Sequence, residues 1–161
     1  MRILQSFVIL ALLSAALPAS ASTMSHIAFL EGTWSCTISS PGGKQTEIDH
    51  NSATLGRKWM HFAGSVAAGM GRPARTYDGY LGPDPNTHGW VYDFVDSFGD
   101  YGIFKSSEAP DAKTQTWIGL DAMDPNDRFT FHALSTTKYT IDFVLVVNGH
   151  AAHTHQACTK T

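Results

Sequence analysis

Cysteine and clustered basic residues are both scarce in this 161-residue chain, and each scarcity excludes a class of function. The chain has 2 cysteines, Cys36 and Cys158, and no C-x-x-C pair, which argues against thiol redox chemistry. Its 11 Lys and Arg form no basic cluster, so we expect no nucleic acid partner. The chain also lacks the G-x-S-x-G elbow of serine hydrolases and a glycine-rich phosphate loop followed by a helix.

The one long apolar run lies at the N-terminus and predicts an export signal. Arg2 is followed by a largely apolar segment, residues 3–17, and then by the small-residue site Ala19-Ser20-Ala21. About fifteen apolar residues are too few to span a bilayer. We therefore expect residues 1–21 to be a cleaved signal peptide and residues 22–161 to form a single domain. The expected location is the periplasm or the extracellular space, with no membrane insertion of the mature chain.

Helical periodicity is almost absent after residue 31, and short β-type runs take its place. These runs of β-branched and aromatic residues alternate with turn signals such as Ser40-Pro41-Gly42-Gly43 and Asn148-Gly149. Connections this short favour antiparallel neighbours. The pattern predicts an all-β fold, an antiparallel up-and-down barrel of about ten strands. One short helical turn, Ser25 to Leu30, is expected to plug one mouth.

The 2 cysteines lie near the two ends of the mature chain, each in an expected strand. If these strands pair antiparallel with Cys36 opposite Cys158, then Trp34 falls opposite Lys160. One register therefore gives both a disulfide and a cation over an indole face. The bridge would close a loop of about 120 residues, worth about 4–5 kcal/mol in the chain-entropy model. Joining the first and last strands would leave the sheet without exposed edges.

The last hairpin predicts which side chains face inward. An Asn148-Gly149 turn of type I′ pairs Tyr139 with Cys158 and Phe143 with Thr154. If Cys158 faces the interior, so do Tyr139, Ile141, Phe143, Leu145 and Val147. The opposite face then carries Thr140, Asp142, Val144, Val146, His153 and His155. Burying Phe129 and Phe131 as well requires a three-residue loop, 135–137, with Leu134 opposite Lys138.

Alternation in the other strands predicts an aromatic interior, with Tyr101 and Ile103 continuing the face of the preceding strand. The pattern does not choose between Trp117 and Ile118, or between the 59-61-63 and 60-62-64 faces. An apolar lining with few polar groups suits a small hydrophobic or aromatic ligand, and a solidly packed core is the alternative. The candidate ligand-binding residues are Trp90, Tyr92, Phe94, Phe131, Tyr139, Phe143 and His61. We expect a monomer or a weak homodimer.

Histidines and acids leave metal binding and acid–base catalysis open as other functions. His153 and His155 share a face, and His155 lies opposite Asp142, so these three are candidates for a metal site. The alternative there is a cross-strand ion pair in water. Catalysis of isomerase or lyase type would need inward pairs such as Asp96 with His61, or Tyr92 with His50. Asp96 is otherwise a turn residue, and we favour a binding protein over an enzyme.

The segment Gly32-Thr33-Trp34 resembles the G-x-W signature of lipocalins. In that family the Trp packs at the closed end of the barrel, covered by a basic residue of the last strand, and Lys160 is the matching position. The second lipocalin signature, T-D-Y, is absent. Residues 28–160 as a whole are similar to exported bacterial proteins of unknown function with a lipocalin-like (calycin-type) barrel. The shared segments are the G-x-W opening, residues 77–84, residues 96–99 after a Trp-rich strand, and the closing Cys158-x-Lys160. The resemblance implies a fold and no activity.

Some related ten-stranded barrels bind haem through one histidine. Their opening, G-T-W-x-G-x-G, is interrupted here by Ser35-Cys36-Thr37. An axial ligand would have to be an inward His50, His61 or His132. We therefore expect neither haem nor another cofactor.

Overall fold

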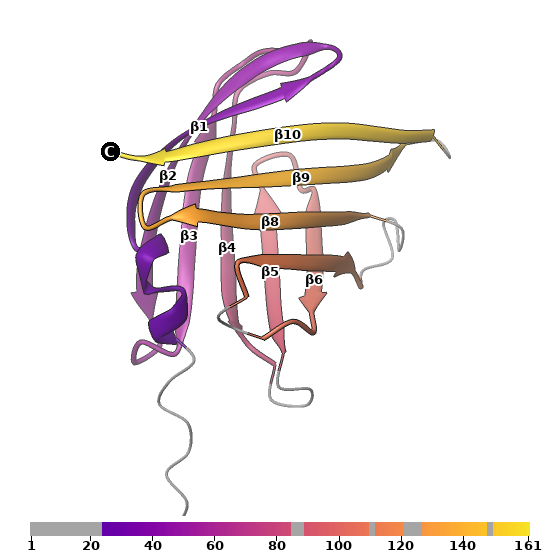
Figure 1. Cartoon of the computed structure of the whole chain (residues 1–161). Coiled ribbons are helices and arrows are strands. Elements are labelled where there is room, and N and C mark those ends of the chain that lie inside the picture. Colours follow the sequence, from indigo (N-terminus) through magenta and orange to yellow (C-terminus); the bar gives the residue numbers. More distant parts are fainter. Residues whose placement is uncertain (1–23, 85–88, 110–111, 121–126, 148–149) are drawn as a thin grey trace, which may run out of the picture.

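Ten strands and two short 3-10 turns make up the structure, a computed structural model that describes residues 24–84, 89–109, 112–120, 127–147 and 150–161. The turns are η1 (Met24–His26) and η2 (Ala28–Leu30). The strands are β1 (Gly32–Ser40), β2 (Gly43–Thr54), β3 (Trp59–Val66), β4 (Arg75–Pro83), β5 (Trp90–Asp96), β6 (Tyr101–Ser106), β7 (Thr114–Gly119), β8 (Arg128–Ser135), β9 (Lys138–Val147) and β10 (His150–Lys160). Each strand is antiparallel to the next, and β1 pairs with β10, so the sheet closes into an up-and-down barrel (Figure 1). The predicted all-β barrel is confirmed.

The barrel closes where β1 and β10 meet. They pair in the predicted register, with Trp34 opposite Lys160 and Cys36 opposite Cys158. The two cysteines form a disulfide, and their Cα atoms lie 4.1 Å apart. Lys160 Nζ lies 5.6 Å from the centre of the Trp34 ring and donates a hydrogen bond to the carbonyl of Phe29 at 3.0 Å. The first strand, the last strand and the N-terminal turns are thus joined at one place.

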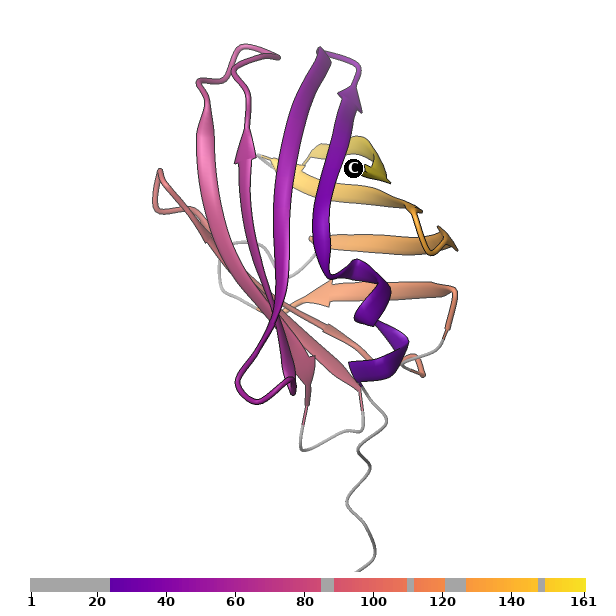
Figure 2. The ribbon, with the colours of Figure 1, turned by 90° about the vertical axis from the view of Figure 1, so that its left-hand side faces the viewer.

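The two N-terminal turns lie at one end of the barrel and contribute to its core (Figure 2). They replace the single turn expected over residues 25–30. Ile27 and Leu30 are buried, and the indole N–H of Trp34 donates to the carbonyl of Leu30 at 2.7 Å. Each large apolar side chain buried here contributes about 1.5–3 kcal/mol. In the described ranges, no helix has the length and apolar character needed to cross a bilayer.

The β9–β10 hairpin has the predicted register, including Tyr139 opposite Cys158 and Phe143 opposite Thr154. Tyr139 and Cys158 are buried, whereas Asp142 and His155 are exposed on the outer face. The Asn148-Gly149 turn and the side chain of Val147 lie outside the described residues. Cross-strand neighbours point to the same side of a sheet, so this hairpin orients the rest of the barrel.

The β8–β9 hairpin has the predicted register, but its turn differs from the predicted loop. Phe129 lies opposite Phe143 and Phe131 opposite Ile141, as expected. The predicted three-residue loop is wrong, because Ser135 pairs with Lys138 and leaves a turn at residues 136–137. The odd residue is accommodated by an irregularity between residues 133 and 135, where Leu134 is 63% exposed. A bulge adds one residue to one strand, so Phe129 and Phe131 still face inward.

Strand β6 has the orientation opposite to the one predicted. Tyr101 and Ile103 are 45% and 40% exposed, whereas Gly102, Phe104 and Ser106 are buried. The reason is the β5–β6 register, which sets Tyr92 opposite Phe104 and so continues the inner face. The two open choices are settled in the same way. Trp117 is buried while Ile118 is 55% exposed, and the 60-62-64 face of β3 points inward.

Candidate functional site

Most of the predicted ligand-binding side chains face the barrel interior. Tyr92 is central among them, with ring contacts to Phe62, Phe94, Phe104 and Phe129 at 5.8–6.4 Å between centroids. Trp90 and Tyr139 are buried. The remaining predicted members of this lining are only partly buried: Tyr92, Phe94, Phe131 and Phe143. Because these side chains point inward, their partial exposure means that solvent reaches the inner face of the barrel.

His61, a candidate ligand-binding residue, does not belong to this lining, because the other face of β3 points inward. It alternates along β3 with the inward residues Met60 and Phe62, and it therefore points outward. Its Nε2 lies 2.8 Å from Asp78 Oδ1, and its ring stacks on Tyr80 at 4.9 Å. Asp78 and Tyr80 belong to β4, so His61 is part of a polar cross-strand cluster on the outer surface.

Neither of the two candidate acid–base pairs forms. His50 is exposed on the outer face, with Nδ1 3.2 Å from Thr33 Oγ1, and cannot reach Tyr92 across the sheet. Asp96 faces inward at the end of β5, but its Oδ1 accepts hydrogen bonds from the backbone N–H groups of Phe98 and Asp100 at 2.9 and 3.0 Å. It acts as the turn residue that was the alternative interpretation.

The histidines proposed for a metal lie on the outer face beside Asp142. His155 Nδ1 and His132 Nε2 lie 2.7 and 3.5 Å from the two oxygens of that carboxylate. A groove of about 270 Å³ on this face is lined by Asp142, His153 and His155, among others. Among the described residues, the one group with three ligand atoms within 4.8 Å is Cys36, Asp49 and Cys158, whose sulphurs are bonded to each other. His50, His61 and His132, the histidines considered for haem, all point outward.

The most unusual feature of the interior is a polar strand. On β2 the inward side chains are Gln45, Glu47, Asp49 and Asn51, each at most 6% exposed. Pairing with β1 sets Glu47 opposite Cys36 and Asp49 opposite Trp34, both of which face inward. Two carboxyl groups therefore enter a barrel that is otherwise largely aromatic.

Glu47 and Asp49 share a network of hydrogen bonds from other strands. The Tyr77 hydroxyl lies 2.7 Å from Asp49 Oδ1 and 3.0 Å from Glu47 Oε1. Gln156 donates to Glu47 Oε1 at 2.7 Å, and the Tyr139 hydroxyl donates to Asp49 Oδ2 at 3.4 Å. The Tyr77 hydroxyl has one proton, so it can donate to only one of the two carboxyl groups. The other contact is a hydrogen bond when that carboxyl group is protonated and donates to the hydroxyl oxygen.

Burial raises the pKa of both acids. The pKa of Glu47 rises from 4.5 to about 8 because its carboxyl group is removed from water and, secondly, because it lies beside Asp49. Burial also raises the pKa of Asp49, against the hydrogen bonds from Tyr77, Glu47 and Tyr139. Across the described residues, no Lys, Arg or His forms an ion pair with either acid. Both shifts favour a protonated carboxyl group in the pair near neutral pH.

Gly64 provides the space that Tyr77 needs to reach the acids. It lies between Asp49 on β2 and Tyr77 on β4 in the strand register. A Cβ atom at this position would lie 2.4 Å from the Tyr77 ring. Since a glycine has no Cβ, the phenol crosses over β3 and its hydroxyl meets both carboxyl groups.

Neither acid is among the residues predicted from sequence, although a signal was present. Ser40-Pro41-Gly42-Gly43 forms a two-residue turn, with Ser40 paired to Gly43. That register sets Glu47 opposite Cys36, so an inward Cys36 implies an inward Glu47.

Comparison with known proteins does not assign the chain to a family. No family model matches the chain, and no curated protein is a significant match.

Proposed function

We propose that this is an exported, lipocalin-like protein that binds a small hydrophobic or aromatic molecule inside the barrel. The observation that carries the proposal is the Glu47–Asp49 pair, which has no cationic partner among the described residues of an otherwise aromatic interior. Buried acids are normally paired or hydrogen-bonded. Tyr77, Tyr139 and Gln156 already donate hydrogen bonds to this pair, so a ligand that carries a hydrogen-bond donor would add a further partner and would be recognised for it.

The surroundings of the acids narrow the ligand class further. The rings of Tyr77 and Tyr139 lie beside the carboxyl groups, and Tyr92 and Phe94 continue the aromatic surface. An aromatic body would stack on these rings, and a hydroxyl or amine group would donate to Asp49. A protonated amine would also gain from the ring faces. The expected ligand is therefore small and aromatic, with one hydroxyl or amine group.

The apolar N-terminal segment and the disulfide support export. Residues 1–21 have the composition of a cleaved leader, and disulfides are rare in reducing compartments. The closed ten-strand antiparallel barrel is consistent with a lipocalin-like fold. In this proposal the protein acts in the periplasm or outside the cell as a carrier, as a monomer or a weak homodimer.

Titration with phenylnaphthylamine, a neutral fluorescent probe with one N–H group, tests the proposal. We expect saturable binding at one site per chain. The double variant Glu47→Gln, Asp49→Asn should bind about tenfold more weakly, because hydrogen bonds to a charged acceptor are lost. Glu31→Gln, which changes an exposed acid 3.1 Å from Arg57, is the matched control and should bind as the wild type does. Absence of saturable binding would refute the proposal.

A second function, acid–base catalysis of isomerase or lyase type, is favoured by the shared proton of the pair. Asp49 as carboxylate would take a proton from the carbon next to a ketone, while Glu47 protonates the carbonyl oxygen to give an enol. Reversal in heavy water exchanges that proton for deuterium. Loss of the methyl signal of acetylnaphthalene in the NMR spectrum measures this exchange. We expect either acid-to-amide variant to abolish it, and exchange at the rate of buffer alone would exclude this function.

A further inference from the structure

Two tryptophans in the core have indole N–H groups without a hydrogen-bond partner. Trp90 and Trp117 are 0% and 3% exposed, and the Nε1 atom of each is buried and unpaired among the described residues. Trp34 shows the usual arrangement, since its N–H donates to the carbonyl of Leu30 at 2.7 Å. Buried polar groups are rarely left unpaired, and each such group costs about 1–3 kcal/mol.

Trp90 and Trp117 lie in one layer of the barrel. Trp90 pairs with Ser106 across β5 and β6. The β6–β7 register, Phe104 with Gly119 and Lys105 with Ile118, places Ser106 opposite Trp117 at its next step. The two indoles therefore stand on either side of a buried, small residue. Both Nε1 atoms lie below the accessible surface of the ligand-free barrel, so an oxygen acceptor reaches them when neighbouring side chains move.

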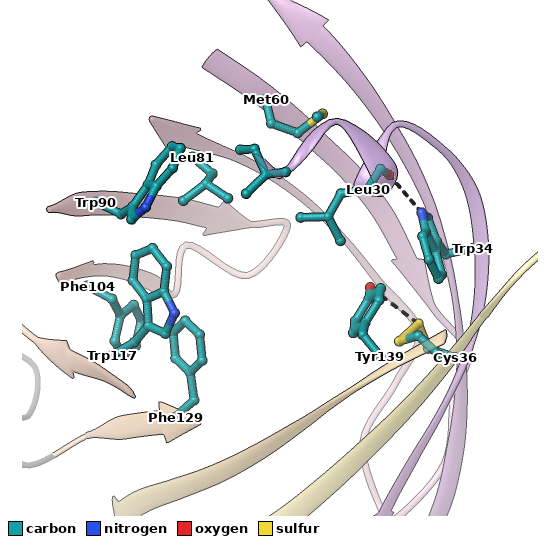
Figure 3. Close-up of a cluster of buried hydrophobic side chains, with 12 residues drawn as sticks. Leu30, Trp34, Cys36, Met60, Leu81, Trp90, Phe104, Trp117, Phe129 and Tyr139 are labelled. Carbon is teal, nitrogen blue, oxygen red and sulfur yellow. Dashed lines mark hydrogen bonds between the residues drawn. A yellow bond between two sulfur atoms is a disulfide. The ribbon is translucent and has the colours of Figure 1, made fainter. Parts of the chain in front are cut away.

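No described residue accepts a hydrogen bond from either indole, and the Ser106 hydroxyl between them is hydrogen-bonded to Glu108. Trp117 stacks on Phe129 at 5.4 Å, and Phe104 contacts the same ring at 5.1 Å. Figure 3 shows Trp90 and Trp117 with Phe104 and Phe129 on one wall of the interior, and Trp34, Cys36 and Tyr139 on the other. Asp49 lies at this second wall, 3.7 Å from Cys36 Sγ. The donors and the acids thus belong to opposite sides of the same interior.

We propose that Trp90 and Trp117 form a subsite for a neutral oxygen acceptor, a carbonyl or ether group of the ligand, to which their indole N–H groups donate. This inference rests on the proposed function, because it needs a ligand inside the barrel. A neutral oxygen fits better than a carboxylate, since the acids across the interior would repel an anion. The ligand then has an acceptor at one end and a donor at the other, which excludes plain hydrocarbons and fatty acids.

Two probes of nearly equal shape test the subsite: acetylnaphthalene, which has a carbonyl group, and ethylnaphthalene, which lacks it. In the wild type we expect the ketone to bind about tenfold more tightly, as displacement of phenylnaphthylamine would measure. Trp90→Phe and Trp117→Phe remove an N–H group and should each reduce this preference to about threefold or less. Trp59→Phe is the matched control, because Trp59 packs on Gly82 at the outer face of the barrel and should leave the preference intact.

A second measurement uses the unmodified protein and does not depend on how the variants fold. In a nitrogen-labelled sample, the indole N–H signals of Trp90 and Trp117 should move downfield with the ketone and less with the hydrocarbon. Equal affinity for both probes, or unmoved indole signals in the ketone complex, overturns the subsite and leaves the proposed function standing; an ordered water on the indoles would give this result. If neither probe displaces phenylnaphthylamine, the subsite fails and the proposed function stands. If phenylnaphthylamine itself does not bind, the proposed function fails, and the subsite fails with it.

Discussion

Glu47 carries a carboxyl group into the barrel interior, and the proton on that group links folding to pH. Burial raises its pKa from 4.5 to about 8, so the folded chain holds a proton that the unfolded chain releases. Stability contributed by this proton is present below pH 4.5 and is lost as pH rises towards 8. For one group the slope is at most about 1.4 kcal/mol per pH unit. Glu47→Gln keeps the shape of the protonated acid, and we expect its unfolding free energy to depend less on pH.

Urea denaturation at a series of pH values between about 5 and 9 measures this dependence. Near pH 8 the Glu47→Gln variant should be more stable than the wild type, because it carries no charge to bury. Glu31→Gln makes the same chemical change at an exposed position, beside Arg57, and should keep the wild-type slope. A Glu47→Gln profile parallel to that of the wild type would show that Glu47 is already ionised in the folded chain.

Sequence alternation predicts single residues well only where one face of a strand is clearly polar. Tyr92 and Phe94 flank Asp93 and were predictable for that reason. His61 was not, because residues 59–62 place large side chains on both faces. Strand β2 inverts the usual rule, with Glu47 and Asp49 inside while Ile48 is 38% exposed. Hydrophobic alternation alone cannot find an interior that contains acids.

At the scale of elements, turn chemistry predicts a strand pairing when the turn itself sets the register. The Asn148-Gly149 signal was enough for β9 and β10, and the paired cysteines were enough for β1 and β10. The irregularity at Leu134 was not predictable, since no glycine or other local signal distinguishes a bulge from a longer loop there. The orientation of β6 depended on its partner, because its own exposed apolar residues, Tyr101 and Ile103, resemble a core face.

The contact between β10 and the N-terminal turns depends on Lys160. Its ammonium group lies over Trp34 and donates to the carbonyl of Phe29, so it satisfies a backbone acceptor and covers an indole. Lys160→Met keeps most of the apolar stem and removes the charge and the donor. We expect a loss of about 1–3 kcal/mol in unfolding free energy, measured by urea denaturation. Lys138→Met, at the exposed start of β9, should change it by less than about 0.5 kcal/mol. Equal effects of the two substitutions would contradict a specific role for Lys160.

At the scale of the whole molecule, the order of the strands makes one junction decisive. Nine of the strand pairs join neighbours in sequence, and β1–β10 alone joins residues far apart in the described chain. The acids lie beside β1, and the indoles lie on β5 and β7. These two walls of the interior face each other because the β1–β10 junction closes the barrel. An open sheet would leave Glu47 and Asp49 in water, where their proton would not be held.

The disulfide should therefore stabilise the molecule without determining its fold. It spans 122 residues of sequence, and a loop of that size predicts about 4–5 kcal/mol of stabilisation through the unfolded state. The double variant Cys36→Ala, Cys158→Ala should lose up to this amount in unfolding free energy and melt at a lower temperature. Its strand content by circular dichroism should stay near that of the wild type, because the β1–β10 backbone pairing and the Lys160 contacts remain. Wild-type protein treated with a thiol reductant is the control, and it should match the variant once both thiols can be labelled. If the labelled, reduced protein melted at the wild-type temperature, the junction would be held by packing alone and the bridge would contribute little.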